Sequence, residues 1–287
     1  MTPSKLAPIP RPIIERVVAA ALAEDLGLIG DITSEATIPS DKTATCVMAA
    51  RQAGVLAGID VAAAAFRHLN PDVSFEASKA DGAPLESGDV IATIHGNARQ
   101  ILSAERVALN FMGRMSGIAS QTRAYVDRIA GTNAAVIDTR KTTPGLRALE
   151  KYAVRAGGGM NHRIGLFDAV LIKDNHVAIA GGITAAITAA RARAGHMVKI
   201  EVEVDTLEQL KEALNHKIDA VLLDNMPPAM LREAVQIVDG RVTTEASGAI
   251  NFDTIRAVAE TGVDLISVGA LTHSVTVLDI GLDTTIA

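Results

Sequence analysis

Basic residues gather at two points in the second half of the chain. Arg140 and Lys141 directly follow the apolar segment 135–138, and Lys173 directly follows the apolar segment 169–172. If these segments are parallel strands, their carboxyl ends lie together at the mouth of a barrel. The planar guanidinium of arginine binds carboxylate or phosphate groups through two parallel hydrogen bonds. The pattern therefore predicts a site for a polyanionic ligand.

Other basic residues in the same stretch have a simpler interpretation. Arg147, Lys151 and Arg155 fall in the helical run 145–156. Long cationic side chains on a helix usually extend into solvent from its polar face. We therefore expect these three residues to lie on a solvated helix face rather than in the anion site.

Acidic residues follow the next two apolar segments. Glu201 and Glu203 are two positions apart in the segment 198–204, so strand alternation places them on one face. Asp224 ends the segment that begins at residue 220. A salt bridge to Lys173 is one interpretation. The other, which we favour, is that Glu203 and Asp224 face Mg²⁺ or sugar hydroxyls, because carboxylate oxygens suit Mg²⁺ that also contacts phosphates.

Small residues and glycines follow the last two apolar segments. These loops contain Ser247, Gly248 and Ala249, and then Ser267 and Gly269. Loops in this position of a barrel often bind phosphate through backbone amides, and a helix N-terminus there adds a favourable dipole. No Gly-x-Gly-x-x-Gly motif follows a strand and no Walker loop is present, which disfavours dinucleotide and nucleoside-triphosphate folds.

These residues require an alternation of strands and helices to position them. Six short apolar segments alternate with helix-length segments after Gly131, which predicts parallel strands in an α/β fold. Both an irregular, partly open (β/α) barrel and a closed eightfold one fit this pattern. The predicted strands are 135–138, 169–172, 198–204, 220–223, 242–245 and 265–268.

The first part of the chain has a different order of predicted helices and strands. A helix is predicted from Pro12 to Gly27, strands at 43–50 and 90–94, and a helix at 61–69, which together indicate an α+β domain. A long helical stretch from about 98 to 130 follows, with an interruption expected near Gly113 and Ser116–Gly117. We place the domain boundary there. The predicted N-terminal domain spans 1–116 and the predicted catalytic barrel spans 117–287, with the C-terminal tail able to return to the N-terminal domain.

The composition excludes several classes of partner. The net charge is −6 with a pI near 5.7, and aromatic residues make up 2% of the 287 residues with no tryptophan. Broad nucleic-acid binding and docking on anionic lipid both need a basic surface. Residues 1–12 lack the apolar core of a signal peptide, and no apolar run approaches the roughly 18 residues of a membrane span. We therefore expect a cytoplasmic protein without nucleic-acid or membrane partners.

Ordered matches along nearly the whole chain resemble the quinolinate phosphoribosyltransferases, also called nicotinate-nucleotide pyrophosphorylases (carboxylating). The resemblance implies transfer of phosphoribosyl from phosphoribosyl pyrophosphate to quinolinate with decarboxylation, a step of NAD biosynthesis. It implies an N-terminal α/β sandwich and a partly open α/β barrel. It also implies a homodimer or a larger homo-oligomer with shared active sites, Mg²⁺ as the cofactor, and no organic cofactor. The matching segments are Glu24–Asp25, Gly30–Thr33, Glu105–Asn110, Asp138–Gly145, Asn161–Arg163, Leu171–His176, Glu201–Glu203, Leu222–Asn225 and Glu245–Gly248.

The resemblance also implies roles for individual residues. Arg106 would reach the site from the neighbouring subunit, and Lys141 would lie near the pyrophosphate. Lys173, Glu203 and Asp224 would be the catalytic residues, with Glu203 and Asp224 also facing Mg²⁺ and the ribose. The residues that would hold quinolinate are Thr139, Arg140, His162, Arg163 and Lys173, and those that would line the sugar phosphate are Ser247, Gly248, Ala249, Ser267 and Gly269.

One position departs from the family pattern. Ala249 stands where many relatives have Gly or Asn. If the position requires a positive φ, alanine costs roughly 1 to 2 kcal/mol there. We expect a modest backbone shift in the loop instead.

Three other functions compete with this interpretation. A paralogue associated with molybdenum transport resembles the same family and has an uncertain substrate. An aldolase could form a Schiff base on Lys173. A non-catalytic anion-binding or sensor protein would bind the ligand without releasing pyrophosphate. A fourth class, the biotinyl or lipoyl carriers, resembles residues 86–91 but needs a lysine at a tight turn, where this sequence continues Thr93–Asn97.

Overall fold

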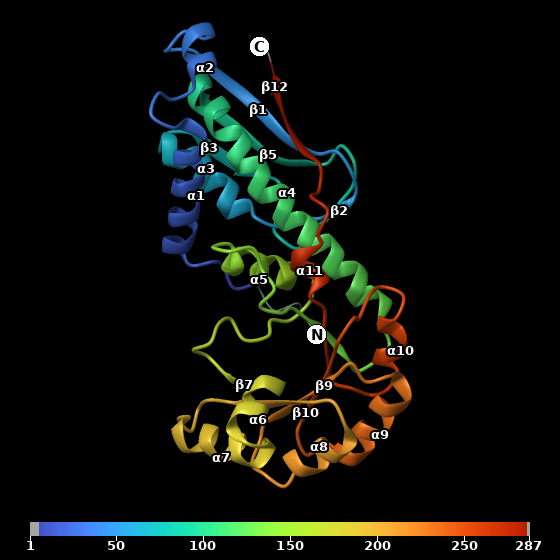
Figure 1. The fold of residues 1–287 in the computed structure, drawn as a ribbon. Coiled ribbons are helices and arrows are strands. Elements are labelled where there is room, and N and C mark those ends of the chain that lie inside the picture. The colour runs from blue at the N-terminus through green and yellow to red at the C-terminus, as the bar shows by residue number, and fades with distance from the viewer. Residues whose placement is uncertain (1–5, 286–287) are drawn as a thin grey trace. The chain divides into compact units, whose positions relative to one another are not determined.

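The computed structural model describes residues 6–285, and these divide into two compact units (Figure 1). The first unit comprises the residues up to 123, residues 142–158 and the residues from 274 onward. The second comprises 124–141 and 159–273. The division at 123/124 falls within helix α4 (Ala98–Arg128), as does the expected boundary at 116/117, and the C-terminal segment belongs to the first unit.

A four-stranded antiparallel sheet forms the centre of the first unit. Its strand order is β12 (Ile280–Thr285), β1 (Thr43–Ala50), β5 (Val90–Asn97) and β3 (Ser74–Ala77). Helix α3 (Ile59–Leu69) packs on β3 and against α1 (Arg11–Leu26). The predicted sandwich of helices and strands is confirmed. The shorter elements of this unit are α2 (Ile32–Thr37), β2 (Gly54–Val55), β4 (Pro84–Leu85) and α5 (Arg147–Ala156).

The expected interruption of the long helix is wrong, because α4 is continuous from Ala98 to Arg128. Its small residues allow close packing rather than a break. A Cβ atom at Gly113 would lie 2.9 Å from the carbonyl oxygen of Leu278, and one at Gly117 would collide with that of Thr276. The buried Ser116 hydroxyl accepts a hydrogen bond of 3.0 Å from the backbone N–H of Ala57. These residues therefore dock two chain segments onto an unbroken helix.

The interpretation of Lys151 as a solvated helix residue is also wrong. Lys151 is 3% exposed and Glu150 is 1% exposed, and most of α5 is buried within the first unit. The Glu150 carboxylate accepts hydrogen bonds from Arg114 at 2.6 and 2.9 Å, and Tyr152 donates one to Asp81 at 2.7 Å. The helical run thus presents polar groups to the interior, where partners from other segments satisfy them.

A six-stranded parallel sheet forms the second unit, as the alternation of strands and helices predicts. Helices α7 to α10 pack along it, with α7 on β7 and β8, α8 on β8, α9 on β10 and α10 on β11 (Figure 1). Strands β6 and β7 are its edges, which agrees with an open α/β arrangement. The strand order is β6 (Ala135–Ile137), β11 (Leu265–Ser267), β10 (Thr243–Ser247), β9 (Ala220–Asp224), β8 (Ile200–Val204) and β7 (Val170–Ile172). The helices are α6 (Asp174–Ala180), α7 (Ile183–Arg193), α8 (Leu207–Ala213), α9 (Pro228–Val238), α10 (Ile255–Ala259) and α11 (Ala270–His273).

The pairing register aligns the carboxyl ends of these strands. Ser247 of β10 is paired with Asp224 of β9, and Ser267 of β11 is paired with Ile137 of β6. Because the strands are parallel, the residues that follow them emerge along the same edge of the sheet. Strand β8 alternates between fully buried valines and partly exposed Glu201 and Glu203, so both glutamates share one face, as predicted.

The loops after β9 and β10 interlock through unusual backbone conformations. The backbone N–H of Asn225 donates a hydrogen bond of 3.0 Å to the carbonyl of Ser247. Asn225 and Ala249 both have positive φ, at 53° and 47°, and Gly248 has φ 97°. A Cβ atom at Gly248 would clash with the Asn225 side chain, so only glycine fits there. Ala249 itself adopts the left-handed conformation, contrary to the expected backbone shift.

Replacement Ala249→Gly should stabilise the protein. Glycine removes the left-handed strain of roughly 1 to 2 kcal/mol but adds entropy to the unfolded chain, so the free energy of unfolding should rise by about 0.5 to 1 kcal/mol. Urea denaturation measures this change. The matched control is Ala189→Gly on the exposed face of α7, which should lose about 1 kcal/mol. Equal losses in both variants would contradict the strain assigned to Ala249.

Candidate active site

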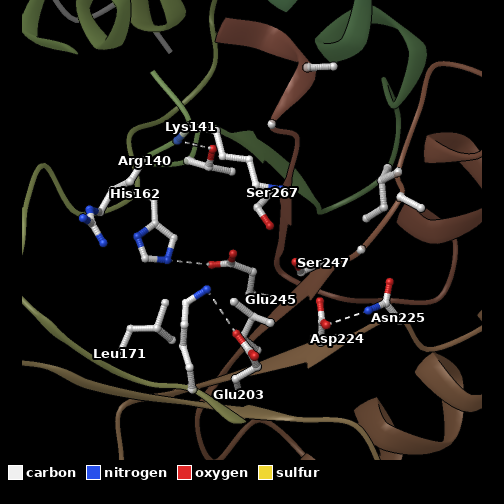
Figure 2. A pocket seen from close by; sticks show the side chains of 18 of the residues that line it. Arg140, Lys141, His162, Leu171, Glu203, Asp224, Asn225, Glu245, Ser247 and Ser267 are labelled. Carbon is white, nitrogen blue, oxygen red and sulfur yellow. Dashed lines mark hydrogen bonds and ion pairs between the residues drawn. The ribbon is translucent and has the colours of Figure 1, made fainter. Parts of the chain in front are cut away.

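A cavity of about 770 Å³ opens at the carboxyl edge of the parallel sheet (Figure 2). All its lining residues belong to the second unit and come from the loops and strand ends described above. The lining includes every predicted site residue of this unit, namely Thr139, Arg140, Lys141, His162, Arg163, Lys173, Glu203, Asp224, Ser247, Gly248, Ala249, Ser267 and Gly269. Arg106 is exposed on α4 in the first unit and is not among the lining residues.

Two arginines crowd together at one part of the cavity. Burial lowers the pKa of Arg163, and the positive charge of Arg140 lowers it further. Arg163 donates a hydrogen bond of 3.0 Å from Nη1 to the carbonyl of Ala169, while its buried Nε has no hydrogen-bond partner among the described residues. A buried donor without an acceptor and two neighbouring guanidinium groups are both costly. An anion between them would relieve both costs.

The fully buried Asp138 holds the loop that presents these groups. Its carboxylate accepts hydrogen bonds from the side chain of Asn161 at 2.6 Å and from the backbone N–H of His162 at 2.9 Å. The hydroxyl of Thr139 accepts one from the backbone N–H of Lys141 at 3.0 Å. The loop after β6 and the loop 161–163 are therefore fixed to each other at the cavity wall.

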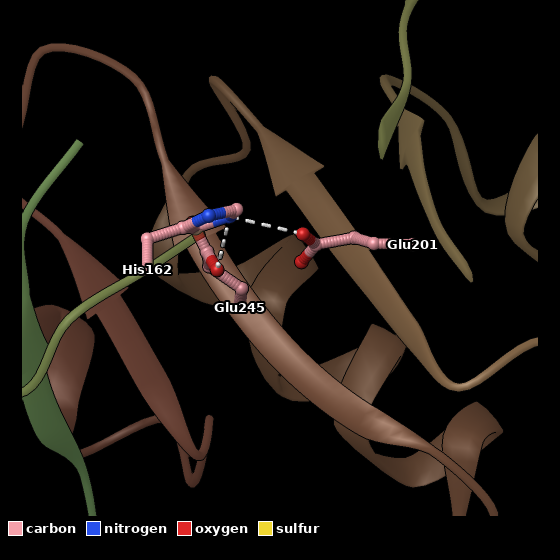
Figure 3. Close-up of side chains that lie close together, drawn as sticks. All are labelled: His162, Glu201 and Glu245. Carbon is pink, nitrogen blue, oxygen red and sulfur yellow. Dashed lines mark hydrogen bonds and ion pairs between the residues drawn. The ribbon is translucent and has the colours of Figure 1, made fainter. Parts of the chain in front are cut away.

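The imidazole of His162 lies beside two glutamates. Its Nε2 is 3.0 Å from Glu201 Oε2 and 3.5 Å from Glu245 Oε2 (Figure 3). Its Nδ1 accepts a hydrogen bond of 2.6 Å from the backbone N–H of Arg163. Nδ1 therefore acts as an acceptor, which leaves Nε2 as the protonated nitrogen that donates towards the carboxyl groups.

Opposite charges meet at another part of the cavity. Lys173 Nζ lies 3.6 Å from Glu203 Oε2, and the lysine side chain is 48% exposed whereas that of the glutamate is 12% exposed (Figure 2). Burial raises the pKa of Glu203; the charge of Lys173 lowers it and that of Asp224 raises it. Asp224 accepts a hydrogen bond of 2.6 Å from the side chain of Asn225. Two carboxylates thus share a region that a cation would stabilise.

The glycine-containing loops lie next to a further basic group. A Cβ atom at Gly269 would lie 3.1 Å from Lys141 Cδ and 3.1 Å from His273 Nε2. The absence of a side chain at Gly269 therefore leaves space where two basic side chains meet. An anionic group bound there would meet the ammonium group of Lys141, the imidazole of His273 and backbone amides.

Three polar residues that line the cavity were not assigned from the sequence: Asn225, Glu245 and His273. Two signals could have found Glu245 and His273. Strand alternation in Thr243–Ser247 places Glu245 on the same face as Ser247, and one helical turn after Gly269 brings His273 back to that glycine.

Comparison with known proteins places this arrangement in a family. Residues 31–116 match the model of the quinolinate phosphoribosyl transferase N-terminal domain, and residues 118–283 match that of the C-terminal domain. A protein of Mycobacterium leprae named nicotinate-nucleotide pyrophosphorylase [carboxylating] is 48% identical over 271 residues, which cover 93% of this chain and 95% of the relative. One of Bacillus subtilis (strain 168), named as a probable enzyme of the same kind, is 47% identical over 264 residues, covering 92% and 91%.

A solved structure agrees with these sequence matches. The nicotinate-nucleotide pyrophosphorylase from Francisella tularensis superposes with a TM-score of 0.93 at 40% identity, covering 98% of this chain and 99% of that one. The two domain models together span most of the described residues, and the identities are high over nearly the full length of each relative. The chain therefore belongs to the quinolinate phosphoribosyltransferase family.

Proposed function

We propose that this protein transfers phosphoribosyl from phosphoribosyl pyrophosphate to quinolinate in an Mg²⁺-dependent reaction that yields nicotinate mononucleotide, pyrophosphate and CO2. One observation carries the proposal. A single cavity holds a crowded pair of arginines, a lysine–glutamate pair beside a second carboxylate, and two small-residue loops. These three regions match a dicarboxylate, a ribose with its metal, and a phosphate. The names of the relatives support the same reaction.

The arginine region is suited to the two carboxylates of quinolinate. Burial and the positive charge of Arg140 lower the pKa of Arg163, and the Nε of Arg163 is buried without an acceptor among the described residues. A dianion would neutralise both guanidinium groups and accept their hydrogen bonds. Lys173, Thr139 and His162 line the same cavity and complete the binding residues that we assign to this substrate.

The region around Glu203 and Asp224 fits both the ribose and Mg²⁺. Each residue offers carboxylate oxygens, and both burial and the negative charge of Asp224 raise the pKa of Glu203, which supports the binding of a cation beside them. When bound there, Mg²⁺ would neutralise part of the charge of the pyrophosphate leaving group. The carboxylates themselves would stabilise the positive charge that develops on the ribose.

The two small-residue loops would hold the sugar phosphate. Ser247, Gly248 and Ala249 form one wall, and Ser267 and Gly269 form the other. Lys141 and His273 meet at Gly269 and add positive charge beside it. Backbone amides in such loops bind phosphate without a net charge of their own.

The reaction follows from this placement. The ring nitrogen of quinolinate forms a bond to the anomeric carbon as the bond to pyrophosphate breaks and the electron pair leaves with pyrophosphate. The ring nitrogen then carries a positive charge. The bond to the adjacent carboxylate breaks, its electron pair is drawn towards the cationic ring, and CO2 departs while the ring carbon takes up a proton. The cationic ring acts as the electron sink, so no organic cofactor is required.

The surroundings of Lys173 favour this function over an aldolase. Schiff-base lysines are commonly activated by an apolar pocket or by a neighbouring cation. Lys173 is instead half exposed and lies 3.6 Å from Glu203. A molybdenum-associated paralogue and an anion sensor would both fail to form nicotinate mononucleotide.

The homodimer and the cytoplasmic location stay predictions. None of the described helices is long and apolar enough to span a membrane.

The direct test is a product assay. The purified protein, Mg²⁺, quinolinate and phosphoribosyl pyrophosphate are mixed, and the products are separated by chromatography. We expect nicotinate mononucleotide and CO2 in equal amounts. Omission of either substrate is the control, and no product in the complete mixture would overturn the proposed function.

Nicotinate should be a poor substrate. It carries one carboxylate, so binding it leaves part of the arginine region desolvated without a counter-charge. We expect kcat/KM for nicotinate to be lower than for quinolinate by roughly 100-fold or more. Steady-state kinetics with both acids measure the ratio. Similar efficiencies for the two acids would contradict the assignment of Arg140 and Arg163 to a dicarboxylate.

Replacement Asp224→Asn should impair catalysis without unfolding the protein. Asparagine keeps the shape and can still accept the hydrogen bond from Asn225, but it lacks the charge that would hold Mg²⁺. We expect kcat to fall by at least about tenfold, with a higher Mg²⁺ concentration needed for half-maximal rate. The control is Asp205→Asn, because Asp205 is exposed after β8 and does not line the cavity. Normal turnover of the Asp224 variant at all Mg²⁺ concentrations would refute the metal and ribose role.

Arg106 should act in the active site of the neighbouring subunit. Inactive Arg106→Ala protein is mixed with inactive Lys173→Ala protein under conditions that exchange subunits. Each mixed dimer then contains one intact and one doubly damaged site, so activity should return to about a quarter of the wild-type value. The control mixture of Arg140→Ala with Lys173→Ala should stay inactive, because both residues line one cavity of the same chain. Activity in neither mixture would indicate that Arg106 does not act across subunits.

A further inference from the structure

His162 and Glu245 line the cavity and form a cluster with Glu201, and the proposed reaction gives no role to the two glutamates. His162 Nε2 and the oxygens of Glu201 and Glu245 all lie within 4.8 Å of one another (Figure 3). The side chains of Glu201 and Glu245 are 12% and 2% exposed. Two buried carboxyl groups this close repel each other if both are ionised.

The available protons decide how this repulsion is relieved. Nδ1 of His162 accepts the backbone N–H of Arg163, so the imidazole has only its Nε2 proton to offer. Nε2 lies 3.0 Å from Glu201 Oε2 and 3.5 Å from Glu245 Oε2, which makes Glu201 the nearer acceptor. One donated hydrogen bond from a neutral ring does not compensate two negative charges. The positive charge of Arg163 also acts on Glu201, so a second proton on the other carboxyl group, that of Glu245, would relieve the repulsion.

Glu245 is the better position for that proton. It is the more deeply buried of the two, and its Oε1 has no hydrogen-bond partner among the described residues. Burial raises the pKa of Glu245 well above its usual range, and the charge of Glu201 raises it further. An ionised Glu245 would leave a charged oxygen buried without a donor.

We propose that Glu245 is a neutral carboxylic acid that positions His162: it donates its proton to Glu201, which then holds the Nε2–H of His162 and fixes that ring at the cavity wall. This proposal rests on the proposed function, because the ring of His162 lies beside quinolinate only if quinolinate is the substrate. Glu245 is thus a positioning residue. Its neutral form also keeps one negative charge out of a cavity that must bind a dianion.

A metal ion is the competing explanation for the cluster. Coordination by Nε2 requires that nitrogen to be unprotonated and normally places the proton on Nδ1. Here Nδ1 accepts a hydrogen bond from the backbone N–H of Arg163, so this ring presents a proton rather than a lone pair to the glutamates. The geometry therefore favours a proton over a metal ion.

Ionisation of Glu245 at high pH should weaken quinolinate binding. Its negative charge would oppose the substrate carboxylates, so KM for quinolinate should rise as the pH rises through the pKa of Glu245. Other charged groups in the cavity or next to it contribute to the local charge, and the variants below separate their effects from that of Glu245. Asp138 after β6 and Glu201 on β8 lie next to Glu245. The cavity lining adds Glu203 on β8, Asp224 on β9, and the basic residues Arg140, Lys141, His162, Arg163, Lys173 and His273.

The test compares Glu245→Gln with Glu245→Ala. The amide of glutamine has the size of the acid and can donate to Glu201, whereas alanine removes the donor and leaves a cavity. We expect KM for quinolinate to be about tenfold lower in the glutamine variant than in the alanine variant, with a smaller difference in kcat. The alkaline rise of KM should be lost in the glutamine variant.

Two further measurements do not depend on turnover. The infrared band of a protonated carboxyl group should disappear in Glu245→Gln, but not in Glu150→Gln, since Glu150 is equally buried and is ion-paired with Arg114. The stability that Glu245 contributes is complete below its unfolded pKa near 4.5 and is lost as the pH rises through its higher folded pKa. The thermal midpoint of Glu245→Gln should therefore fall less at alkaline pH than that of the wild type.

The outcomes distinguish this proposal from the proposed function. A glutamine variant that fails to fold, or that matches alanine in KM with no change of the infrared band, would overturn the neutral acid. The neutral acid would also be overturned if elemental analysis of the purified protein found a stoichiometric metal ion that is lost in Glu245→Gln. Absence of product from the wild-type protein would instead refute the proposed function and leave the infrared result valid on its own.

Discussion

Repulsion between like charges at one edge of a sheet is the constraint on which this site depends. Parallel strands deliver Arg140 and, through the neighbouring loop, Arg163 to the same place, and burial together with their mutual charge lowers the pKa of Arg163. A folded protein tolerates such crowding only if fixed acidic groups hold the loops and a ligand supplies the remaining negative charge. Asp138 provides the first of these by binding the backbone at His162. The substrate provides the remaining negative charge, so the crowded positive charges are also the groups that recognise it.

The same constraint orders the rest of the cavity. Arg140 follows β6 at one edge of the sheet, whereas Glu203 and Asp224 lie on β8 and β9, and the interlocked loops after β9 and β10 line the same cavity. A dicarboxylate and a sugar pyrophosphate are both anionic, so their reacting atoms approach only when separate groups neutralise each of them. A neutral Glu245 is part of this balance, because an additional buried charge would favour neither substrate.

Much of this arrangement could be predicted from the sequence. Apolar segments followed by polar residues located all six strands of the second unit and most of the cavity lining, because strand alternation and the carboxyl-edge rule are local properties. Features that depend on packing could not be predicted. The glycines of α4 marked close approach of another segment rather than a break, and Lys151 is buried by segments distant in sequence. Likewise, the role of Glu245 depends on a histidine 83 positions earlier (245 minus 162) and on their separation in space.

The central claim is that Arg140 and Arg163 form the region that recognises two carboxylates. Isothermal titration calorimetry of quinolinate and nicotinate with the wild-type protein and with Arg163→Gln measures it most directly, because the four affinities form a cycle between one arginine and one substrate carboxylate. The account predicts that the wild-type preference for quinolinate falls by at least about tenfold in the variant. An unchanged preference, with both acids weakened equally, would contradict it.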